Sequence, residues 1–260
     1  MERWKGKWAL VTGASAGIGL ALAEQLAAAG THLVLTARRR DRLEQLAKEL
    51  RAKHSVQVEI VAADLMQPGA PEELLAFAKN KGIDIDLLVN NAGFGNYGPF
   101  QKSELSRELA MIQVNCRAMV HLTRLFLPAM VDRKLGDILI LGSTASFQGV
   151  PYMATYAATK AFDLLFSEAL AEEVREFGVR VCCLCPGSTE SEFRNVAGTP
   201  AHAIARQETA EKVARVGLQA LAAGKSYVIS GAANYLMAHS QRLTPRRMVT
   251  RIAGKMFRPR

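Results

Sequence analysis

The stretch from Lys7 to Ala29 restricts the fold more than any other part of the sequence. Residues 7–12 form a short apolar run without turn residues, and residues 18–29 carry apolar side chains at helical intervals. The segment between them, Thr12-Gly13-Ala14-Ser15-Ala16-Gly17-Ile18-Gly19, spaces its glycines as G-x-x-x-G-x-G. Glycine lets the backbone turn sharply and lets a phosphate approach main-chain N–H groups at a helix N-terminus. We therefore expect a strand, a phosphate-binding turn and a helix, with a turn that binds no ligand as the alternative.

A second strand and helix follow directly. Residues 32–37 are mostly apolar, and the helix after them carries apolar residues at Leu43, Leu46, Ala47 and Leu50. In a dinucleotide-binding fold the end of the second strand faces the adenosine ribose. Ala37 occupies this position and Arg38 comes next, so no carboxylate repels a 2′-phosphate and a guanidinium can pair with it. This favours NADP(H) over NAD(H), whereas Arg40 and Arg42 fit a solvated helix start.

The rest of the chain repeats this alternation. We predict further strands at residues 56–62, 86–89, 137–142, 179–185 and 226–230. We predict helices at residues 101–130, from near 151 and at 208–222, and a loop at 188–207. Pro128 should bend or stop the first of these helices. The pattern indicates a single α/β domain over residues 1–230 and a basic, amphipathic C-terminal extension over residues 231–260.

Tyr156 and Lys160 stand four residues apart in the helix predicted from near Pro151, so they share one helical face. A nearby ammonium favours phenolate and lowers the pKa of a tyrosine, which can then exchange a proton with a reacting oxygen. By itself such a pair is more often a surface pair. Ser143 ends a predicted strand and can reach Tyr156 through the intervening loop. Asn115 lies in the middle of a helix, where asparagine is unfavourable without a specific role.

Composition limits the class of protein. A chain of 260 residues with 49 % hydrophobic residues can bury the core of one large domain. The N-terminus is charged and no stretch is apolar enough for a signal peptide or a membrane span, so we expect a cytoplasmic protein. Cys182, Cys183 and Cys185 fall in a predicted buried strand, which argues against redox or zinc chemistry. We expect no metal site.

The net charge of +9 is concentrated in the extension, which holds seven Arg or Lys and no acid from Gly231 onward. Because the remaining body is only weakly basic, we do not expect a nucleic-acid partner. A helix beginning at Pro245 would have an apolar face formed by Met248, Val249, Ile252, Ala253, Met256 and Phe257. Its other face would be basic, with Arg246, Arg247, Arg251, Lys255 and Arg258. The apolar face could pack on this protein or its dimer partner, or the helix could make a peripheral contact with an anionic membrane or an acidic carrier protein.

These residues together resemble the single-domain form of the short-chain dehydrogenase/reductase superfamily, over residues 7–230. The resemblance is carried by the glycine turn, Asp64, Asn90-Asn91-Ala92-Gly93, Asn115, Ser143, Tyr156-x-x-x-Lys160 and Pro186-Gly187, in the family's order and spacing. It implies an α/β fold with a doubly wound, Rossmann-like parallel sheet of about seven strands and helices on both faces. It also implies a homodimer or homotetramer, paired through the long helices that bear Asn115 and Tyr156.

The resemblance assigns roles to individual residues. Tyr156 is the acid that protonates the carbonyl oxygen, Lys160 lowers its pKa and holds the nicotinamide ribose, and Ser143 donates to the same oxygen. Asn115 exposes a helical carbonyl that holds a water in a proton relay. The implied cofactor-binding residues are Gly13, Ser15, Gly17, Ile18, Gly19, Arg38, Asp64, Leu65, Asn90, Ala92, Gly93, Tyr156, Lys160, Pro186 and Gly187. Where the family often has a threonine after Pro186-Gly187, this chain has Ser191, which retains the hydroxyl.

The first functional hypothesis is an NADP(H)-dependent carbonyl reductase, written reversibly as an alcohol dehydrogenase. A narrower alternative is a reductase of 3-oxoacyl thioesters, and a remote one is a non-catalytic dinucleotide-sensing scaffold. Expected walls of the substrate pocket are Phe94, Tyr97, Phe147, Gln148, Tyr152 and Phe193. These are largely apolar, which favours a hydrophobic or medium-sized carbonyl substrate.

Overall fold

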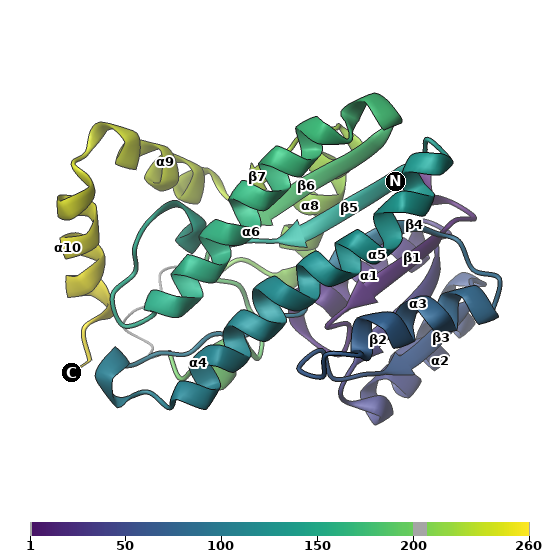
Figure 1. Ribbon diagram of the computed structural model, residues 1–260, viewed down its shortest axis with the longest axis horizontal. Coiled ribbons are helices and arrows are strands. Elements are labelled where there is room, and N and C mark those ends of the chain that lie inside the picture. The colour runs from purple at the N-terminus through teal and green to yellow at the C-terminus, as the bar shows by residue number, and fades with distance from the viewer. Residues whose placement is uncertain (1, 200–206, 260) are drawn as a thin grey trace.

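The computed structural model describes residues 2–199 and 207–259 and contains one seven-stranded sheet in the order β3-β2-β1-β4-β5-β6-β7 (Figure 1). The strands are β1 (Trp8–Thr12), β2 (His32–Ala37), β3 (Val58–Ala62), β4 (Ile85–Asn90), β5 (Gly136–Leu141), β6 (Val179–Cys185) and β7 (Tyr227–Ile229). Every pairing is parallel. The strand order reverses between β1 and β4, and ligands bind at such a reversal in open α/β sheets. The predicted doubly wound fold is confirmed.

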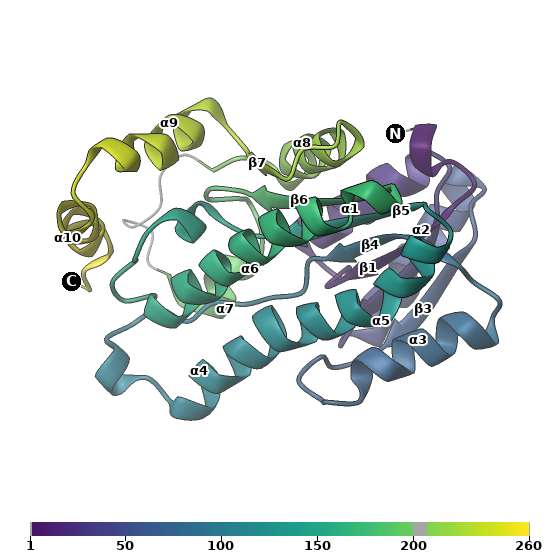
Figure 2. The same ribbon diagram turned by 45° about the horizontal axis from the view of Figure 1, so that its top comes forward.

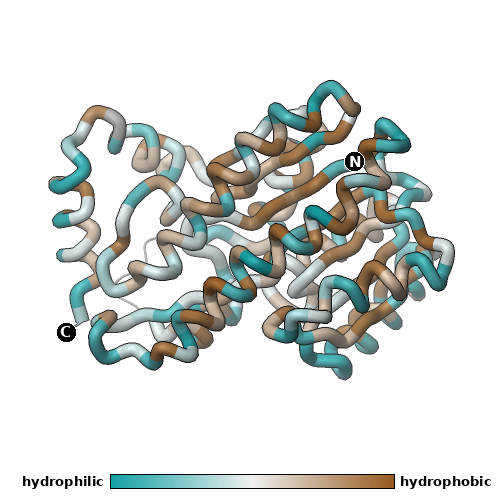
Figure 3. Tube along the Cα trace, in the orientation of Figure 1, coloured by the Kyte–Doolittle hydropathy of each residue, from teal (hydrophilic) through white to brown (hydrophobic). Residues whose placement is uncertain are grey.

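Helices cover both faces of the sheet and enclose two cores. Strands buried on both faces send alternate side chains to opposite sides, so Val11 joins one core and Leu10 the other. The first core is covered by α1 (Gly17–Ala28), α2 (Arg40–His54) and α8 (Ala210–Ala222). The second is covered by α3 (Ala70–Asn80), α5 (Met119–Asp132) and the end of α6 (Ala154–Glu173). The hydrophobic tint of the central strands in Figure 3 reflects this two-sided burial.

The long helix predicted at residues 101–130 consists of three segments. It begins at α4 (Leu105–Ile112), after a short 3₁₀ turn at Phe100–Lys102, and continues through a π-helical segment at Gln113–Ala118 into α5. The π segment contains Asn115. Pro128 does not stop the helix, which continues to Asp132.

The predicted loop at 188–207 contains a short helix, α7 (Phe193–Ala197), and a single bridge from Thr189 to Glu208. The part of this prediction that concerns residues 200–206 lies outside the described residues.

The extension forms two helices, α9 (Ala232–Ser240) and α10 (Arg246–Phe257), linked by a 3₁₀ turn at Gln241–Leu243. The sequence predicted α10 but not α9. Figures 1 and 2 both place the pair at one end of the molecule, away from α2 and α3. Within the described ranges, no helix combines the length and the apolar character needed to cross a bilayer.

Candidate active site

A cavity of about 1140 Å³ lies at the carboxyl ends of the central strands, and the glycine turn forms one of its walls. Gly13 and Gly17 both have left-handed backbones, with φ of 66° and 57°. A Cβ on Gly17 would lie 2.9 Å from the Cβ of Ser191. Helix α1 begins here with no side-chain cap at Ala16 and no acid in its first turn, so its free amides can receive an anion. This cradle fits the pyrophosphate of a dinucleotide.

Two residues expected to bind cofactor do not line the cavity. Gly19 lies behind the turn, where a Cβ would collide with the carbonyl oxygen of Gly13 and with Asn91, so its role is close packing of helix on turn. Asn90 turns away, because its Nδ2 donates to Thr123 Oγ1 at 3.0 Å. Asn91 lines the wall instead, and its Nδ2 donates to the Thr12 carbonyl at 2.8 Å. The other expected cofactor residues line the cavity: Gly13, Ser15, Gly17, Ile18, Arg38, Asp64, Leu65, Ala92, Gly93, Tyr156, Lys160, Pro186 and Gly187.

A basic cluster stands where β2 ends. Arg38 lines the cavity, is exposed, and makes no hydrogen bond or ion pair with the part of the chain that the structure describes. Arg39 also lines it, with Nη2 donating to Ser15 Oγ at 2.9 Å and Nη1 lying 2.7 Å from Glu192 Oε2. Arg42, expected to be simply solvated, pairs with the same carboxylate at 2.6 Å. The hydrogen bond from Arg42, and then that from Arg39, lowers the pKa of Glu192. Neither Arg39 nor Glu192 was predicted as a site residue. Arg39 lies directly beside Arg38 in a basic run, whereas no local pattern in the sequence places Glu192 here.

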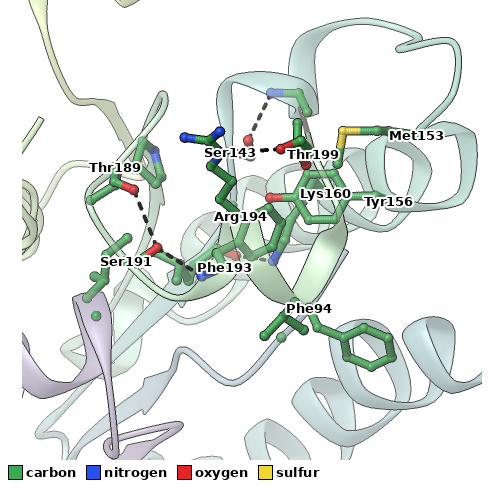
Figure 4. Close-up of a pocket in the computed structure, with 18 of the residues that line it drawn as sticks. Phe94, Ser143, Met153, Tyr156, Lys160, Thr189, Ser191, Phe193, Arg194 and Thr199 are labelled. Atoms are coloured by element: carbon green, nitrogen blue, oxygen red, sulfur yellow. Dashed lines mark hydrogen bonds between the residues drawn. The ribbon is translucent and has the colours of Figure 1, made fainter. Parts of the chain in front are cut away.

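Tyr156, Ser143 and Lys160 converge on the cavity (Figure 4). Lys160 Nζ lies 5.9 Å from the centre of the Tyr156 ring, and both Lys160 and Ser143 act to lower the pKa of the Tyr156 phenol. Burial raises the pKa of Tyr156, and this effect exceeds the lowering by Lys160 and Ser143. The expected influence of Lys160 therefore has the right sign, but the net direction predicted from the sequence is wrong, because the pattern of residues carries no information on desolvation.

Asp163 forms a buried ion pair with Lys160 and was not predicted from the sequence as a site residue. Lys160 Nζ lies 3.0 Å from Asp163 Oδ2 and donates to the Leu141 carbonyl at 2.6 Å. Burial is the largest effect and by itself would lower the pKa of Lys160, but the charge of Asp163, the charge of Tyr156 and the hydrogen bond to Asp163 together raise it. Burial raises the pKa of Asp163, and Lys160 partly offsets this. Asp163 follows Lys160 by three positions on one helix, and this spacing in the sequence could have predicted the ion pair.

Asn115 fastens the π-helical segment to the cavity wall. Its Oδ1 accepts from the Phe94 amide at 3.1 Å, and its Nδ2 donates to the Phe94 carbonyl at 3.0 Å and to Thr159 Oγ1 at 3.0 Å. A Cβ on Gly93 would lie 3.1 Å from Asn115 Oδ1 and 3.6 Å from Lys160 Nζ, so both side chains approach Gly93. Asn115 itself lies just outside the lining of the cavity.

The substrate side of the cavity differs in part from the expectation. Phe94, Gln148 and Phe193 line it, and the Phe193 ring lies 5.2 Å from that of Tyr156. Three aromatic residues predicted as walls do not line it: Tyr97, Phe147 and Tyr152. Each instead packs with a second ring, Tyr97 with Tyr152 and Phe147 with Tyr227.

The extension supplies walls that the sequence did not assign to the site. The lining residues from α9, α10 and their connection are Asn234, Met237, Ser240, Gln241, Thr244, Val249, Ile252, Ala253, Met256 and Phe257. The Tyr97 hydroxyl donates to the Phe257 carbonyl at 2.8 Å, and Ala253 is buried. The expectation that the apolar face packs on this protein is confirmed for the row Val249–Ala253–Phe257, whereas the row Met248–Ile252–Met256 is about half exposed. The extension therefore forms part of the cavity wall.

The cysteine-rich segment is the buried strand β6, as predicted. Burial raises the pKa of Cys182, and burial raises the pKa of Cys116 on the π segment to about 12, so neither is poised as a thiolate. No group of metal-ligating side chains occurs in the described ranges 2–199 and 207–259.

The family model for short chain dehydrogenases matches residues 7–201. The chain belongs to this family. Members of this family are oxidoreductases that use nicotinamide cofactors. The motif order and the sheet topology agree with this membership.

Two curated relatives carry the name very-long-chain 3-oxoacyl-CoA reductase. The one from Pyricularia oryzae is 38 % identical over 180 residues, which cover 68 % of this chain and 54 % of the relative. The one from Bos taurus is 36 % identical over 187 residues, covering 70 % of this chain and 59 % of the relative. This chain thus spans somewhat over half the length of these relatives. Among solved structures, a short-chain dehydrogenase from Sphingobium yanoikuyae in complex with NADPH is 30 % identical, with a TM-score of 0.82 and coverage of 91 % and 94 % of the two chains.

Proposed function

We propose that this chain is an NADP(H)-dependent oxidoreductase that transfers hydride between nicotinamide C4 and a carbonyl or secondary alcohol, with Tyr156 as the acid and base. The observation that carries the proposal is the convergence of Tyr156, Ser143 and Lys160 on one cavity that also contains the uncapped N-terminus of α1. The intact group argues against a non-catalytic dinucleotide-sensing scaffold.

Each side chain has a distinct chemical task. Tyr156 donates its phenolic proton to the carbonyl oxygen in reduction and takes it back in oxidation. Ser143 donates a hydrogen bond to the same oxygen and stabilises the negative charge that develops there. Lys160 stabilises the phenolate that remains, which matters more because burial opposes that charge. Asp163 keeps Lys160 protonated and in place, and the carbonyl of Asn115 in the π segment can hold a water that returns a proton.

The cofactor assignment follows from the cavity walls. The glycine turn and the amides of α1 would hold the pyrophosphate, Asp64 and Leu65 would flank the adenine, and Pro186-Gly187 would border the nicotinamide. The nicotinamide, when bound, supplies or accepts the hydride. Arg38, which is exposed and unpaired within the described residues, is available for a 2′-phosphate, and Arg39 lies beside it. The NADPH complex of the structural relative from Sphingobium yanoikuyae supports the same preference.

For the substrate, we propose a 3-oxoacyl thioester with a long acyl chain, and a general hydrophobic ketone as the second candidate. The names of the two curated relatives support the thioester. The wall near Tyr156 is apolar, with Phe94, Met153 and Phe193 from the body, and it continues along Met237 and Ile252 of the extension. A cavity of about 1140 Å³ exceeds what a drug-sized ligand usually fills, so it leaves room for a dinucleotide together with an acyl chain.

The decisive experiment measures NADPH oxidation with 3-oxoacyl-CoA thioesters of increasing chain length, with bulky ketones and with small polar ketoses. We expect kcat/KM to rise with acyl length, because each buried methylene adds about 0.8 kcal/mol of binding. Turnover of bulky ketones alone would select the second candidate. A protein that binds NADPH but oxidises it with none of these substrates would support the scaffold alternative.

A further inference from the structure

Seven of the fifteen large hydrophobic residues that are exposed in the described ranges belong to the extension, which is a short part of the chain. Its large exposed hydrophobic residues are Tyr235, Leu236, Met237, Leu243, Met248, Ile252 and Met256. Leu243 is 92 % and Leu236 is 71 % exposed. Isolated exposed side chains of this kind are ordinary, but a group on two neighbouring helices at one end of the molecule indicates an interaction surface (Figure 2). We call these seven residues, together with the four cations named below, the rim face.

No acidic residue of the extension neutralises the cations beside these side chains. On α10 the basic residues Arg246, Arg247, Arg251 and Lys255 are all exposed, and none forms an ion pair within the described parts of the chain. The whole stretch from residue 231 onward contains no Asp or Glu. The rim face therefore presents only positive charge, and its complement is a negatively charged surface.

The arrangement of rows on α10 suits a flat anionic surface. The row Val249–Ala253–Phe257 packs on the body, and the next row around the helix, Met248–Ile252–Met256, is about half exposed. The row beyond that is Arg247–Arg251–Lys255. Apolar side chains thus project beside long cationic ones, which is the pattern of a helix lying at a lipid interface, where the first group enters the acyl region and the second reaches phosphates.

The rim face also adjoins the opening of the cavity. Met237, Ile252 and Met256 line the cavity and yet are 42 %, 49 % and 51 % exposed, so they connect its interior to the outer surface. We infer that the rim face docks on an anionic phospholipid membrane and sets the cavity opening against the lipid. A water-insoluble acyl substrate would then pass from the bilayer along these three side chains towards Tyr156. That last consequence rests on the proposed function, whereas the docking itself does not.

Co-sedimentation with phosphatidylcholine vesicles, with and without phosphatidylglycerol, tests the docking on the full chain. We expect binding to the anionic vesicles and its loss at high salt. A charge variant, R246Q/R247Q/R251Q/K255Q, should weaken partitioning by about fivefold per charge, or several hundredfold in all. An apolar variant, L236Q/L243Q/M248Q, should also bind more weakly. None of the positions changed in the charge variant or in the apolar variant lines the cavity. A control that removes three exposed cations from α2 and α3, K48Q/K53Q/K79Q, should bind as the wild type does.

Several outcomes would overturn the inference. The first is a control that loses vesicle binding as much as the charge variant does. The second is an apolar variant that binds vesicles as tightly as the wild type, and the third is a wild type that does not bind anionic vesicles. If the wild type does not bind vesicles, and the apolar variant self-associates more weakly than the wild type, the rim face binds a second copy of this chain instead. Reduction of a short, soluble substrate should stay unchanged in both variants, so failure of the docking and failure of the proposed function give separate signals.

Discussion

Replacing Asp163 with asparagine tests how the buried ion pair supports Lys160. The two side chains are 6 % and 2 % exposed and their charged atoms lie 3.0 Å apart. At an effective dielectric constant of about 20, unit charges at 3.0 Å attract by about 5 kcal/mol. Removing one partner of a buried pair typically costs about 3–5 kcal/mol. Urea unfolding of Asp163→Asn should therefore show a loss of about 3–5 kcal/mol in the free energy of unfolding.

The same substitution has a directional effect on the pH profile. Burial by itself would lower the pKa of Lys160, and the charge and hydrogen bond of Asp163 are the main effects that oppose this lowering. Without the carboxylate the ammonium of Lys160 loses its proton at a lower pH. Turnover of Asp163→Asn should therefore fall as pH rises through a range in which the wild type is still active, because neutral Lys160 no longer stabilises the Tyr156 phenolate.

Asp137→Asn is the matched control. Asp137 is 2 % exposed and accepts from Arg3 Nε at 2.6 Å and Trp4 Nε1 at 2.8 Å, at the amino end of β5, away from the site. It should lose stability with no change in the pH profile of turnover. If Asp163→Asn lost stability but kept the wild-type pH profile, Asp163 would be a packing residue and its assigned role in holding the proton on Lys160 would be refuted.

Three further predictions concern the cofactor, the acid and the assembly. NADP(H) should bind about ten- to a hundredfold more tightly than NAD(H), and Arg38→Ala should remove most of that difference in parallel titrations; equal affinities in the wild type would contradict the assignment. Tyr156→Phe should abolish turnover with nearly unchanged cofactor affinity, whereas Lys160→Ala should reduce both; substantial turnover by the phenylalanine variant would place the acid elsewhere. Leu165 on α6 is 67 % exposed, so Leu165→Glu should dissociate a homodimer or homotetramer in light scattering, and an unchanged mass would exclude this helix from the interface.

The sequence determined the parts of this protein that depend on neighbouring residues. Apolar runs and helical periodicity predicted the strands and most helices, because these patterns repeat within one element. The glycine turn and the spacing of Tyr156 and Lys160 likewise encode local geometry, and both are found where they were expected. Helix α9 was not predicted. The π segment at Asn115 was not predicted either, since no short-range pattern distinguishes this segment from the α-helix on either side of it.

Tertiary structure decided what depends on solvent exposure and on residues far apart in the chain. Glu192 reaches Arg39 across 153 positions, and only folding brings the two together. The net direction of the Tyr156 pKa follows from burial, which is a property of the packed cavity. The sequence left open what the apolar face of the extension would cover, and the extension forms part of the cavity wall because Val249, Ala253 and Phe257 pack on the body. The periodicity of a sequence indicates which side chains share a helix face, but which residues cover that face depends on the tertiary packing of the whole chain.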